Sequence, residues 1–299
     1  MTPFELFDEN FLRKLEQLRL LAKRVALHAR PGRRRSRRMG DGLEFADHRD
    51  YAPGEDVRFI DWAYYARMEK LLLRLFHEHA EGDVCILLDC SASMTRATSD
   101  PASMAVFPYA LRLAAAMAYV AMGSLERVVI QPFAEELLPP LRTGRGREQI
   151  LAVLEFLARL TPQGRTQLER CSRQLAQHHR LRGSVLLISD LLDCLDDLPR
   201  ACLTLREHND LAVLHLLNPD DARPAATGPV LLQQAENDDE LPLDITPELL
   251  HSYARQWQEF LRHCESTVTT RGGTYLATET TTPFEDVILH TLRRARVLT

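Results

Sequence analysis

Lysine is scarce in this 299-residue sequence, and no two of its cysteines have the close spacing of a metal or disulfide motif. The six cysteines are scattered, with no C-x-x-C pair, so neither a zinc framework nor a disulfide framework is indicated. We expect reduced, buried thiols instead. No H-E-x-x-H motif is present, and the glycine-rich turn at residues 144–146 lacks the Lys-Ser/Thr of a phosphate-binding loop. These absences exclude the commonest zinc-protease and P-loop signatures.

A long apolar segment is also missing. The longest apolar runs, such as residues 114–122, are shorter than the ~20 residues that a helix needs to cross a bilayer. The amino terminus is amphipathic and charged, without the apolar core and cleavage site of a signal peptide. We therefore expect a cytoplasmic protein without a transmembrane segment, and leave open a peripheral contact with a membrane.

Positive charge is in the minority, because the net charge is −5. This balance argues against a general nucleic-acid binder, although six arginines cluster at Arg30, Arg33, Arg34, Arg35, Arg37 and Arg38. Such a block could contact phosphates or an anionic membrane surface. The alternative is a solvated linker in a chain that has only three lysines among its 37 basic residues. We favour the linker and expect no specific nucleic-acid partner.

Hydrophobic residues make up 45% and charged residues 26% of the chain, which is typical of a soluble globular protein. The spacing of apolar positions predicts an amphipathic helix over residues 4–28, whereas residues 40–82 have no clear period apart from a short strand near 71–76. We assign residues 1–82 to an N-terminal extension that comprises this helix, the arginine-rich linker and the segment up to residue 82. Residues 83–299 form the main domain.

From residue 84 onward, buried strands alternate with amphipathic helices, which predicts an α/β domain with a mostly parallel sheet and helices on both faces. An antiparallel edge strand is expected near residues 136–142, where two prolines follow each other. An inserted hairpin is expected near residues 219–245. The expected parallel strands are 84–88, 127–133, 184–189, 211–217 and 274–277, and the expected helices are 102–123, 149–160, 167–179, 198–208, 247–265 and 284–297.

The most informative motif follows the first of these strands. Asp89, Ser91 and Ser93 stand at alternate positions directly after an apolar run. Carboxylate and hydroxyl oxygens suit a hard cation such as Mg²⁺. Loops outside the carboxyl ends of strands are also where open α/β sheets bind ligands. The motif therefore predicts a metal site at that edge.

Two further oxygen donors strengthen this prediction. Thr166 lies in the turn between two predicted helices, and Asp190 ends a second buried strand. Together, the five side chains offer few carboxylates for a divalent cation, so a bound cation would stay electropositive and attract a further anionic ligand. The alternative is that the serines cap the following loop and that Asp190 caps a helix. Capping explains each residue separately but not their joint arrangement.

The motif Asp89-x-Ser91-x-Ser93, followed by Thr166 and Asp190, resembles the metal-ion-dependent adhesion site of von Willebrand factor A domains. The resemblance implies a Rossmann-like sheet with one antiparallel edge strand and Mg²⁺ or Mn²⁺ bound at its top. It also implies that Asp89, Ser91 and Ser93 are the usual direct ligands. Arg165 precedes the threonine where glycine is frequent.

A second pattern lies before the domain. Its polar and aromatic residues could form a catalytic or anion-binding site, with a charge network of Arg58, Asp61 and Arg67 around Trp62. The interpretation that we favour is a structural plug that fixes the segment to its neighbour. The pattern is similar to domain of unknown function fifty-eight, a bacterial and archaeal family often encoded beside MoxR-type AAA+ ATPases, on residues Arg49, Tyr51, Gly54, Asp56, Arg58, Asp61, Trp62 and Arg67.

From the residues and these resemblances, we predict a non-catalytic, metal-dependent interaction protein that binds an acidic side chain of a partner. The resemblance suggests a MoxR-type AAA+ ATPase as partner and a chaperone-like role in remodelling or complex assembly. The alternative is a metal-dependent hydrolase or phosphotransferase that uses the same cation as a Lewis acid. Against it, the motif has no histidine beside the serines and no second aspartate two residues after Asp89.

Overall fold

The computed structural model describes residues 6–28, 44–52, 56–57, 60–77, 83–96, 98–99, 103–124, 126–178, 183–222, 224, 228–233 and 240–294. The chain divides into two compact units, one of residues 1–30 and 82–299 and one of residues 31–81. The predicted boundary at residue 82 instead grouped the first helix with the following segment.

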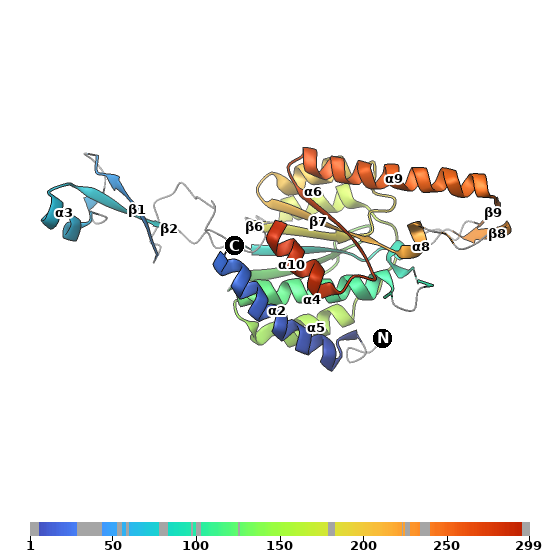
Figure 1. Cartoon of the computed structure of the whole chain (residues 1–299), viewed down its shortest axis with the longest axis horizontal. Helices are drawn as coiled ribbons and strands as arrows, with labels where there is room; N and C mark the ends of the chain where they lie inside the picture. The colour runs from blue at the N-terminus through green and yellow to red at the C-terminus, as the bar shows by residue number, and fades with distance from the viewer. Residues whose placement is uncertain are drawn as a thin grey trace. The chain divides into compact units, whose positions relative to one another are not determined.

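A six-stranded sheet forms the centre of the larger unit (Figure 1). Its strand order is β10-β7-β6-β3-β4-β5, with the β5 pairing antiparallel and the other pairings parallel. This arrangement confirms the predicted α/β class with a mostly parallel sheet. The strands are β3 (Asp83–Asp89), β4 (Arg127–Phe133), β5 (Leu141–Arg142), β6 (Gly183–Ser189), β7 (Asp210–Leu217) and β10 (Thr274–Glu279).

The antiparallel edge is shorter than predicted. Strand β5 has two residues, and the only other pairing of the predicted segment among the described residues is a bridge between Phe133 and Leu137. Pro139 and Pro140 lie between the two pairings. Proline has no N–H to donate to a neighbouring strand, so the ladder is interrupted there.

Helices cover both faces of the sheet because alternate residues of each strand point to opposite sides. In β3, Ile86 and Leu88 join one apolar cluster, and Cys85 and Leu87 join the other. All six cysteines are buried and unpaired, as expected. The first cluster is covered by α4 (Val106–Gly123), α5 (Ile150–Ala158) and α10 (Phe284–Arg294); α6 (Leu168–His178), α7 (Leu198–Arg206) and α9 (Pro247–Thr270) cover the second.

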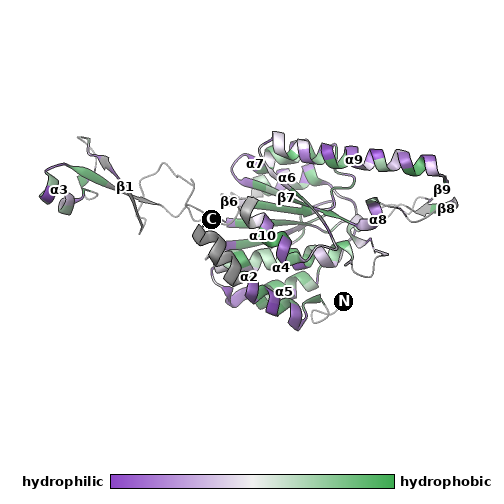
Figure 2. Ribbon diagram, in the orientation of Figure 1, coloured by the Kyte–Doolittle hydropathy of each residue, from purple (hydrophilic) through white to green (hydrophobic). Residues whose placement is uncertain are grey.

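Strand β3 is apolar between its two end residues, whereas α9 alternates polar and apolar residues (Figure 2). Helix α4 is the exception among the helices because it is apolar almost all round. Within the described residues it is the one helix long and apolar enough to cross a membrane by length and composition, and 78% of it is buried inside the protein. A core helix of a large sheet passes the same test.

The first helix, α2 (Glu9–His28), packs on the sheet domain, which explains why it groups with the larger unit. Phe11 is 1% exposed, and its ring centroid lies 4.9 Å from that of Phe284 in α10. Lys14 Nζ lies 2.6 Å from Glu285 Oε1, and the Arg112 Nε of α4 donates to the Leu6 carbonyl at 2.8 Å. The amphipathic helix was predicted correctly. No packing partner was predicted for it.

The smaller unit contains an antiparallel pair, β1 (Glu44–Asp50) and β2 (Leu72–His77), and the short helix α3 (Trp62–Met68). Strand β1 was not predicted, because its sequence is mostly charged. In the larger unit, the short helix α8 (Pro219–Ala222) precedes β8 (Gly228–Gln233) and β9 (Glu240–Ile245). These strands pair antiparallel within the segment where we expected a hairpin.

Candidate metal centre

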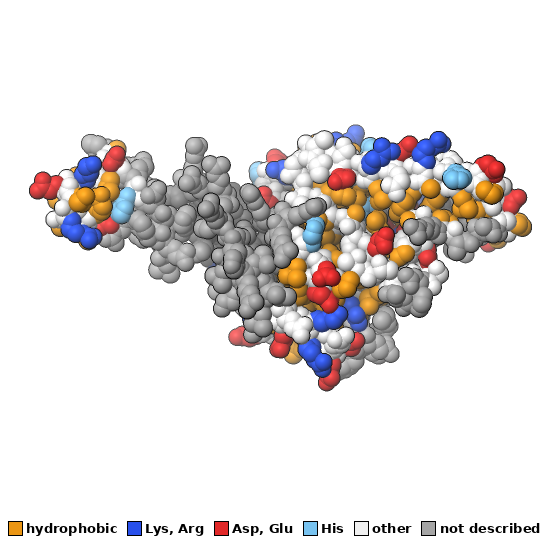
Figure 3. Space-filling model, in the orientation of Figure 1, with side chains coloured by type: hydrophobic (Ala, Val, Ile, Leu, Met, Phe, Trp, Pro, Cys, Tyr) orange, Lys and Arg blue, Asp and Glu red, His pale blue; other side chains and the backbone are white. Residues whose placement is uncertain are grey.

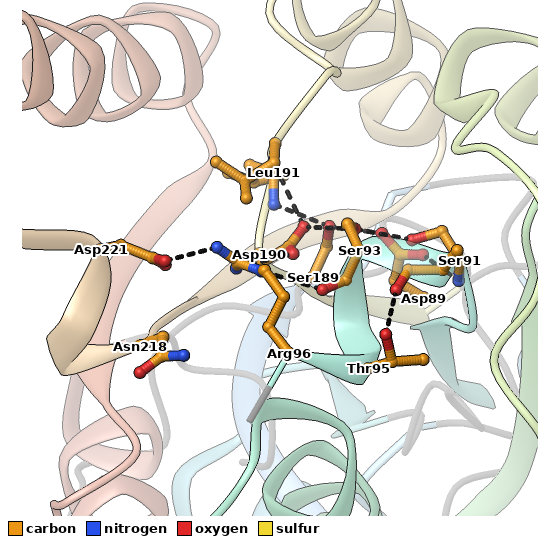
Figure 4. A network of polar contacts seen from close by, with 12 residues as sticks. Asp89, Ser91, Ser93, Thr95, Arg96, Ser189, Asp190, Leu191, Asn218 and Asp221 are labelled. Carbon is orange, nitrogen blue, oxygen red and sulfur yellow. Dashed lines mark hydrogen bonds and ion pairs between the residues drawn. The ribbon is translucent and has the colours of Figure 1, made fainter. Parts of the chain in front are cut away.

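The five predicted donors are all buried, and Figure 4 shows four of them at the carboxyl edge of the sheet. Asp89 is the last residue of β3, and Asp190 directly follows β6. Because β3 and β6 are parallel neighbours, their carboxyl ends bring the two carboxylates to the same edge. Ser91 and Ser93 lie in the turn that follows β3.

Hydrogen bonds hold the Asp89 carboxylate at both oxygens. The Ser91 backbone N–H donates to Oδ1 at 2.9 Å, and the Ser189 hydroxyl donates to Oδ2 at 2.6 Å. The Ser189 hydroxyl in turn accepts the Leu191 N–H at 2.9 Å. Ser189 was not among the predicted site residues, although its position immediately before Asp190 was available as a signal.

The two serines connect the carboxylates. The Ser93 hydroxyl donates to Asp190 Oδ1 at 3.3 Å, and the Ser91 and Ser93 hydroxyl oxygens lie 3.0 Å apart. Because a hydroxyl has one proton, Ser91 donates to Ser93 when Ser93 donates to Asp190. The lone pairs of the Ser91 hydroxyl oxygen then remain available to coordinate a cation.

Thr166 lies in a loop that is joined to the serine loop. The Ala92 N–H donates to the Gly164 carbonyl, and the Gln163 N–H donates to the Cys90 carbonyl, both at 2.8 Å. Gly164 has φ of +74°, a backbone conformation that favours glycine. The Thr166 side chain is 5% exposed, yet its hydroxyl has no hydrogen-bond partner. A buried polar atom without a partner is unusual and is consistent with a missing ligand.

The negatively charged forms of the Asp89 and Asp190 carboxylates are disfavoured in this site. Burial raises the pKa of Asp89, and hydrogen bonds from Ser189 and Ser91 oppose that rise. Burial and the neighbouring Asp89 carboxylate together raise the pKa of Asp190 to about 7, although Arg96 opposes the rise. A second negative charge nearby is unfavourable in a buried site. A cation between the two groups would relieve this repulsion.

The donor set fits a hard divalent cation. Two carboxylates and three hydroxyls are oxygen ligands of the kind that Mg²⁺ and Mn²⁺ prefer. Among the described residues, no group of three or more His, Cys, Asp or Glu side chains is placed to hold a metal. Any cation here would therefore depend on the hydroxyl oxygens, and the unpartnered Thr166 hydroxyl is the observation that favours one.

The capping alternative accounts for only part of this geometry. Asp190 Oδ1 does accept the Leu192 N–H at 3.2 Å, in a tight turn. Ser91, at the N-terminal cap of the short helix Ala92–Thr95, makes no side-chain capping bond. The Ser91 and Ser93 hydroxyls contact each other and Asp190 instead.

Arg96 also belongs to this site and was not predicted. Its Nη2 lies 3.1 Å from Asp190 Oδ2, and its Nη1 lies 2.5 Å from Asp221 Oδ1, which follows β7 in helix α8 (Figure 4). Because Arg96 and Asp221 are 125 positions apart, their pairing could not be read from sequence spacing.

A buried histidine of β7, His215, contacts the backbone of the loop that carries Asp190. His215 Nε2 lies 2.7 Å from the Asp190 carbonyl oxygen, and Nδ1 lies 2.7 Å from the Tyr275 hydroxyl. Since a carbonyl can only accept, Nε2 carries the proton and Nδ1 accepts from Tyr275. Burial lowers the pKa of His215 to about 4. The ring is therefore neutral and positions the Asp190 backbone.

The residues of the second sequence pattern lie in the smaller unit. Asp61 caps α3 by accepting the Tyr64 N–H at 2.9 Å and also lies 2.9 Å from His48 Nε2. Trp62 is 57% exposed, and Arg67 Nε donates to the Ala63 carbonyl. Asp61 thus pairs with His48, and Arg67 bonds within its own helix. Arg58, the third member of the predicted charge network around Trp62, lies outside the described residues, so that network stays a prediction.

The other members of this pattern are placed as follows. The Tyr51 N–H donates to the Leu71 carbonyl at 3.0 Å, and Asp56 is partly buried. Arg49 lies in β1, opposite Leu73 of β2. Gly54, Arg58 and the arginine block at 30–38 lie outside the described residues. The described members therefore belong to a small hairpin and helix.

The sheet order, the antiparallel edge and the oxygen-rich loops at the carboxyl edge define a von Willebrand factor A-like α/β domain. Residues 47–260 match the family described as "Protein of unknown function DUF58", and the chain belongs to this family. Proteins named "Uncharacterized protein Mb1516" of Mycobacterium bovis and "Uncharacterized protein Rv1480" of Mycobacterium tuberculosis are each 29% identical over 219 residues, which is 72% of this chain and 68% of theirs.

Solved structures with a similar fold include BatB from Bacteroides thetaiotaomicron, with a TM-score of 0.41 and 13% identity over 71% of this chain and 97% of that one. A von Willebrand factor type A protein from Catenulispora acidiphila has a TM-score of 0.40 and 15% identity over 74% of this chain and 43% of that one. At these scores, the assignment of the fold rests on the strand order itself.

Proposed function

We propose that this protein is a non-catalytic interaction module that uses a bound Mg²⁺ or Mn²⁺ to hold an acidic side chain of a partner protein. The observation that carries the proposal is that hydrogen bonds join the Asp89 and Asp190 carboxylates to the Ser91 and Ser93 segment, while the hydroxyl of Thr166 in the adjoining loop is buried without a hydrogen-bond partner. The cation would supply an electropositive centre with an open coordination position. The protein's own residues would hold it in place.

A carboxylate is the partner group that fits such a centre best. Asp89 and Asp190 together contribute two negative charges, which only balance the charge of a divalent cation and leave room for a further anionic ligand. A further hard anionic oxygen is the natural next ligand. Charged side chains of both signs are interspersed on the visible face of the larger unit (Figure 3). We therefore assign the selection of the partner to the cation rather than to the charge of that face.

The sequence resemblance supports a MoxR-type AAA+ ATPase as the partner and a chaperone-like role in remodelling or assembling complexes. We propose the cytoplasm as the place of this role. These two elements of the proposal rest on sequence, and the carboxylate recognition rests on the site geometry.

Hydrolysis or phosphoryl transfer at the same cation is the second candidate function. It would require a group that accepts a proton from water or from a hydroxyl nucleophile. His215 touches the site, but both its ring nitrogens are already bonded, and its low pKa makes it a weak base. The geometry therefore favours binding over catalysis.

Capture of protein partners from native lysate tests the proposal. We expect the wild-type chain to retain a partner with Mg²⁺ and to lose it with excess chelator, whereas Asp89→Ala retains none. Asp83→Ala is the matched control, because it removes a carboxylate from the opposite end of the same strand, where Asp83 pairs with Arg127 at 2.8 Å. Equal capture by the wild type and Asp89→Ala in Mg²⁺, or retention of the partner by the wild type in excess chelator, would refute the proposal. Mg²⁺-dependent hydrolysis that is lost in Asp190→Ala would favour the enzyme instead.

A further inference from the structure

The Arg96 guanidinium lies beside Asp190, the carboxylate that the proposed cation would also need. Its guanidinium contacts three segments: Nη2 lies 3.1 Å from Asp190, Nη1 lies 2.5 Å from Asp221, and Nε donates to the Ser93 carbonyl at 2.9 Å. The Arg96 side chain is 24% exposed, whereas the Asp190 side chain is 1% exposed. One arginine therefore links both loops of the site to helix α8.

Helix α8 is fixed independently of Arg96. The Asp220 carboxylate accepts the Ser99 N–H at 2.6 Å and the Ser99 hydroxyl at 2.7 Å. The Tyr253 hydroxyl of α9 donates to the Asp221 carbonyl at 2.7 Å. Asp221 is thus a fixed acceptor beside the site, and Arg96 can keep it as a partner when Asp190 is engaged elsewhere.

We propose that Arg96 is an internal competitor for the divalent cation, shared between Asp190 and Asp221, and that this sharing sets how tightly the site binds metal. This inference rests on the proposed function, because it assumes that a cation binds at Asp89 and Asp190. When the cation engages Asp190, the guanidinium gives up that contact and remains on Asp221. Arg96 is a positioning residue in this scheme and has no contact with a substrate.

Two physical effects support the competition. A guanidinium and a divalent cation that share one buried carboxylate repel each other, and the low local dielectric strengthens that repulsion. Arginine is always protonated, so it cannot reduce the repulsion by losing a proton. Its planar fork can bind two carboxylates at once, whereas a lysine ammonium acts as a single point charge. The pairing with Asp221 is therefore the route by which the positive charge leaves Asp190.

Titration of the full chain with Mn²⁺, followed by the electron paramagnetic resonance signal of the free ion at mildly alkaline pH, tests this scheme. We expect Arg96→Gln to bind Mn²⁺ about tenfold more tightly than the wild type. Asp221→Asn should bind it more weakly, because Arg96 then rests on Asp190 alone. Arg127→Gln is the charge control, since Arg127 pairs with Asp83 at the opposite edge of the sheet.

The double variant separates competition from a simple change of net charge. If Arg96 transmits the effect of Asp221, then adding Asp221→Asn to Arg96→Gln changes the Mn²⁺ affinity little. Additive effects of the two substitutions would overturn the inference, as would unchanged or weaker binding by Arg96→Gln. If the wild type binds no Mn²⁺ at all, the proposed function itself fails; weaker or additive variants with a binding wild type overturn only the role of Arg96.

Discussion

Replacing Thr166 with valine tests whether the Thr166 hydroxyl is a metal ligand or has a structural role. Valine keeps the β-branched shape and removes the hydroxyl, which is buried and has no hydrogen-bond partner. An unsatisfied buried polar group costs about 1–3 kcal/mol. We therefore expect Thr166→Val to raise the free energy of unfolding of the metal-free protein by about 1 kcal/mol. For a chain of this size, that corresponds to a rise in Tm of about 2 °C.

A bound cation should cancel this advantage. Loss of a ligand or of its supporting group lowers metal affinity by about 10–100-fold. At a Mn²⁺ concentration that is 100 times the wild-type Kd, the wild type gains about 2.7 kcal/mol from binding. A tenfold weaker variant gains about 1.3 kcal/mol less. Thr166→Val should thus be the more stable protein in chelator and lose its lead in Mn²⁺.

Thr143→Val is the matched control. Thr143 is equally buried, but its hydroxyl accepts from the Val128 N–H at 3.2 Å and donates to the Val128 carbonyl at 3.1 Å. This substitution should destabilise the protein by about 1–3 kcal/mol with or without cation. Thermal unfolding followed by circular dichroism, in chelator and in Mn²⁺, measures both variants. If Thr166→Val destabilises the metal-free protein as Thr143→Val does, or if it binds Mn²⁺ as tightly as the wild type, our interpretation of the Thr166 hydroxyl is wrong.

Two further predictions concern stability. Phe11→Ala should lower the free energy of unfolding in urea by about 3–5 kcal/mol, because the ring is buried against Phe284; a loss below about 1 kcal/mol would mean that α2 contributes little to the sheet domain. His215 stabilises the fold above its unfolded pKa of about 6.5 and should lose that contribution as the pH falls towards its folded pKa of about 4. Between pH 7 and pH 4, the wild type should therefore lose about 3 kcal/mol relative to His215→Gln in urea unfolding, and parallel profiles would contradict the buried neutral ring.

The sheet domain could be predicted because its signals are local. Buried parallel strands are nearly continuous apolar runs, and the helices between them carry a clear amphipathic period. Strand β1 lacks such a signal, since its residues Glu44–Asp50 are mostly charged and become a strand through pairing with β2. Likewise, the apolar face of α2 shows that the helix must pack, but not that it packs on α10 and α4.

The candidate site was predictable to the same extent. Asp89, Ser91 and Ser93 follow one strand, and Asp190 follows another, so the rule that parallel strands end at one edge brings them together. Arg96 and Asp221 meet only through tertiary structure, and no periodicity connects them. The His48–Asp61 pair in the smaller unit was missed for a related reason, because it depends on how β1 lies beside the start of α3.

Binding of Mn²⁺ to the purified chain tests the central claim most directly. Paramagnetic resonance titration should show one saturable Mn²⁺ site per wild-type chain and none in Asp89→Asn, an isosteric change at a fully buried residue that we predict to be a ligand. Asp83→Asn, at the other end of β3, should bind as the wild type does. Absence of a saturable site in the wild type, or equal binding by Asp89→Asn, would contradict a metal centre built on these oxygen ligands.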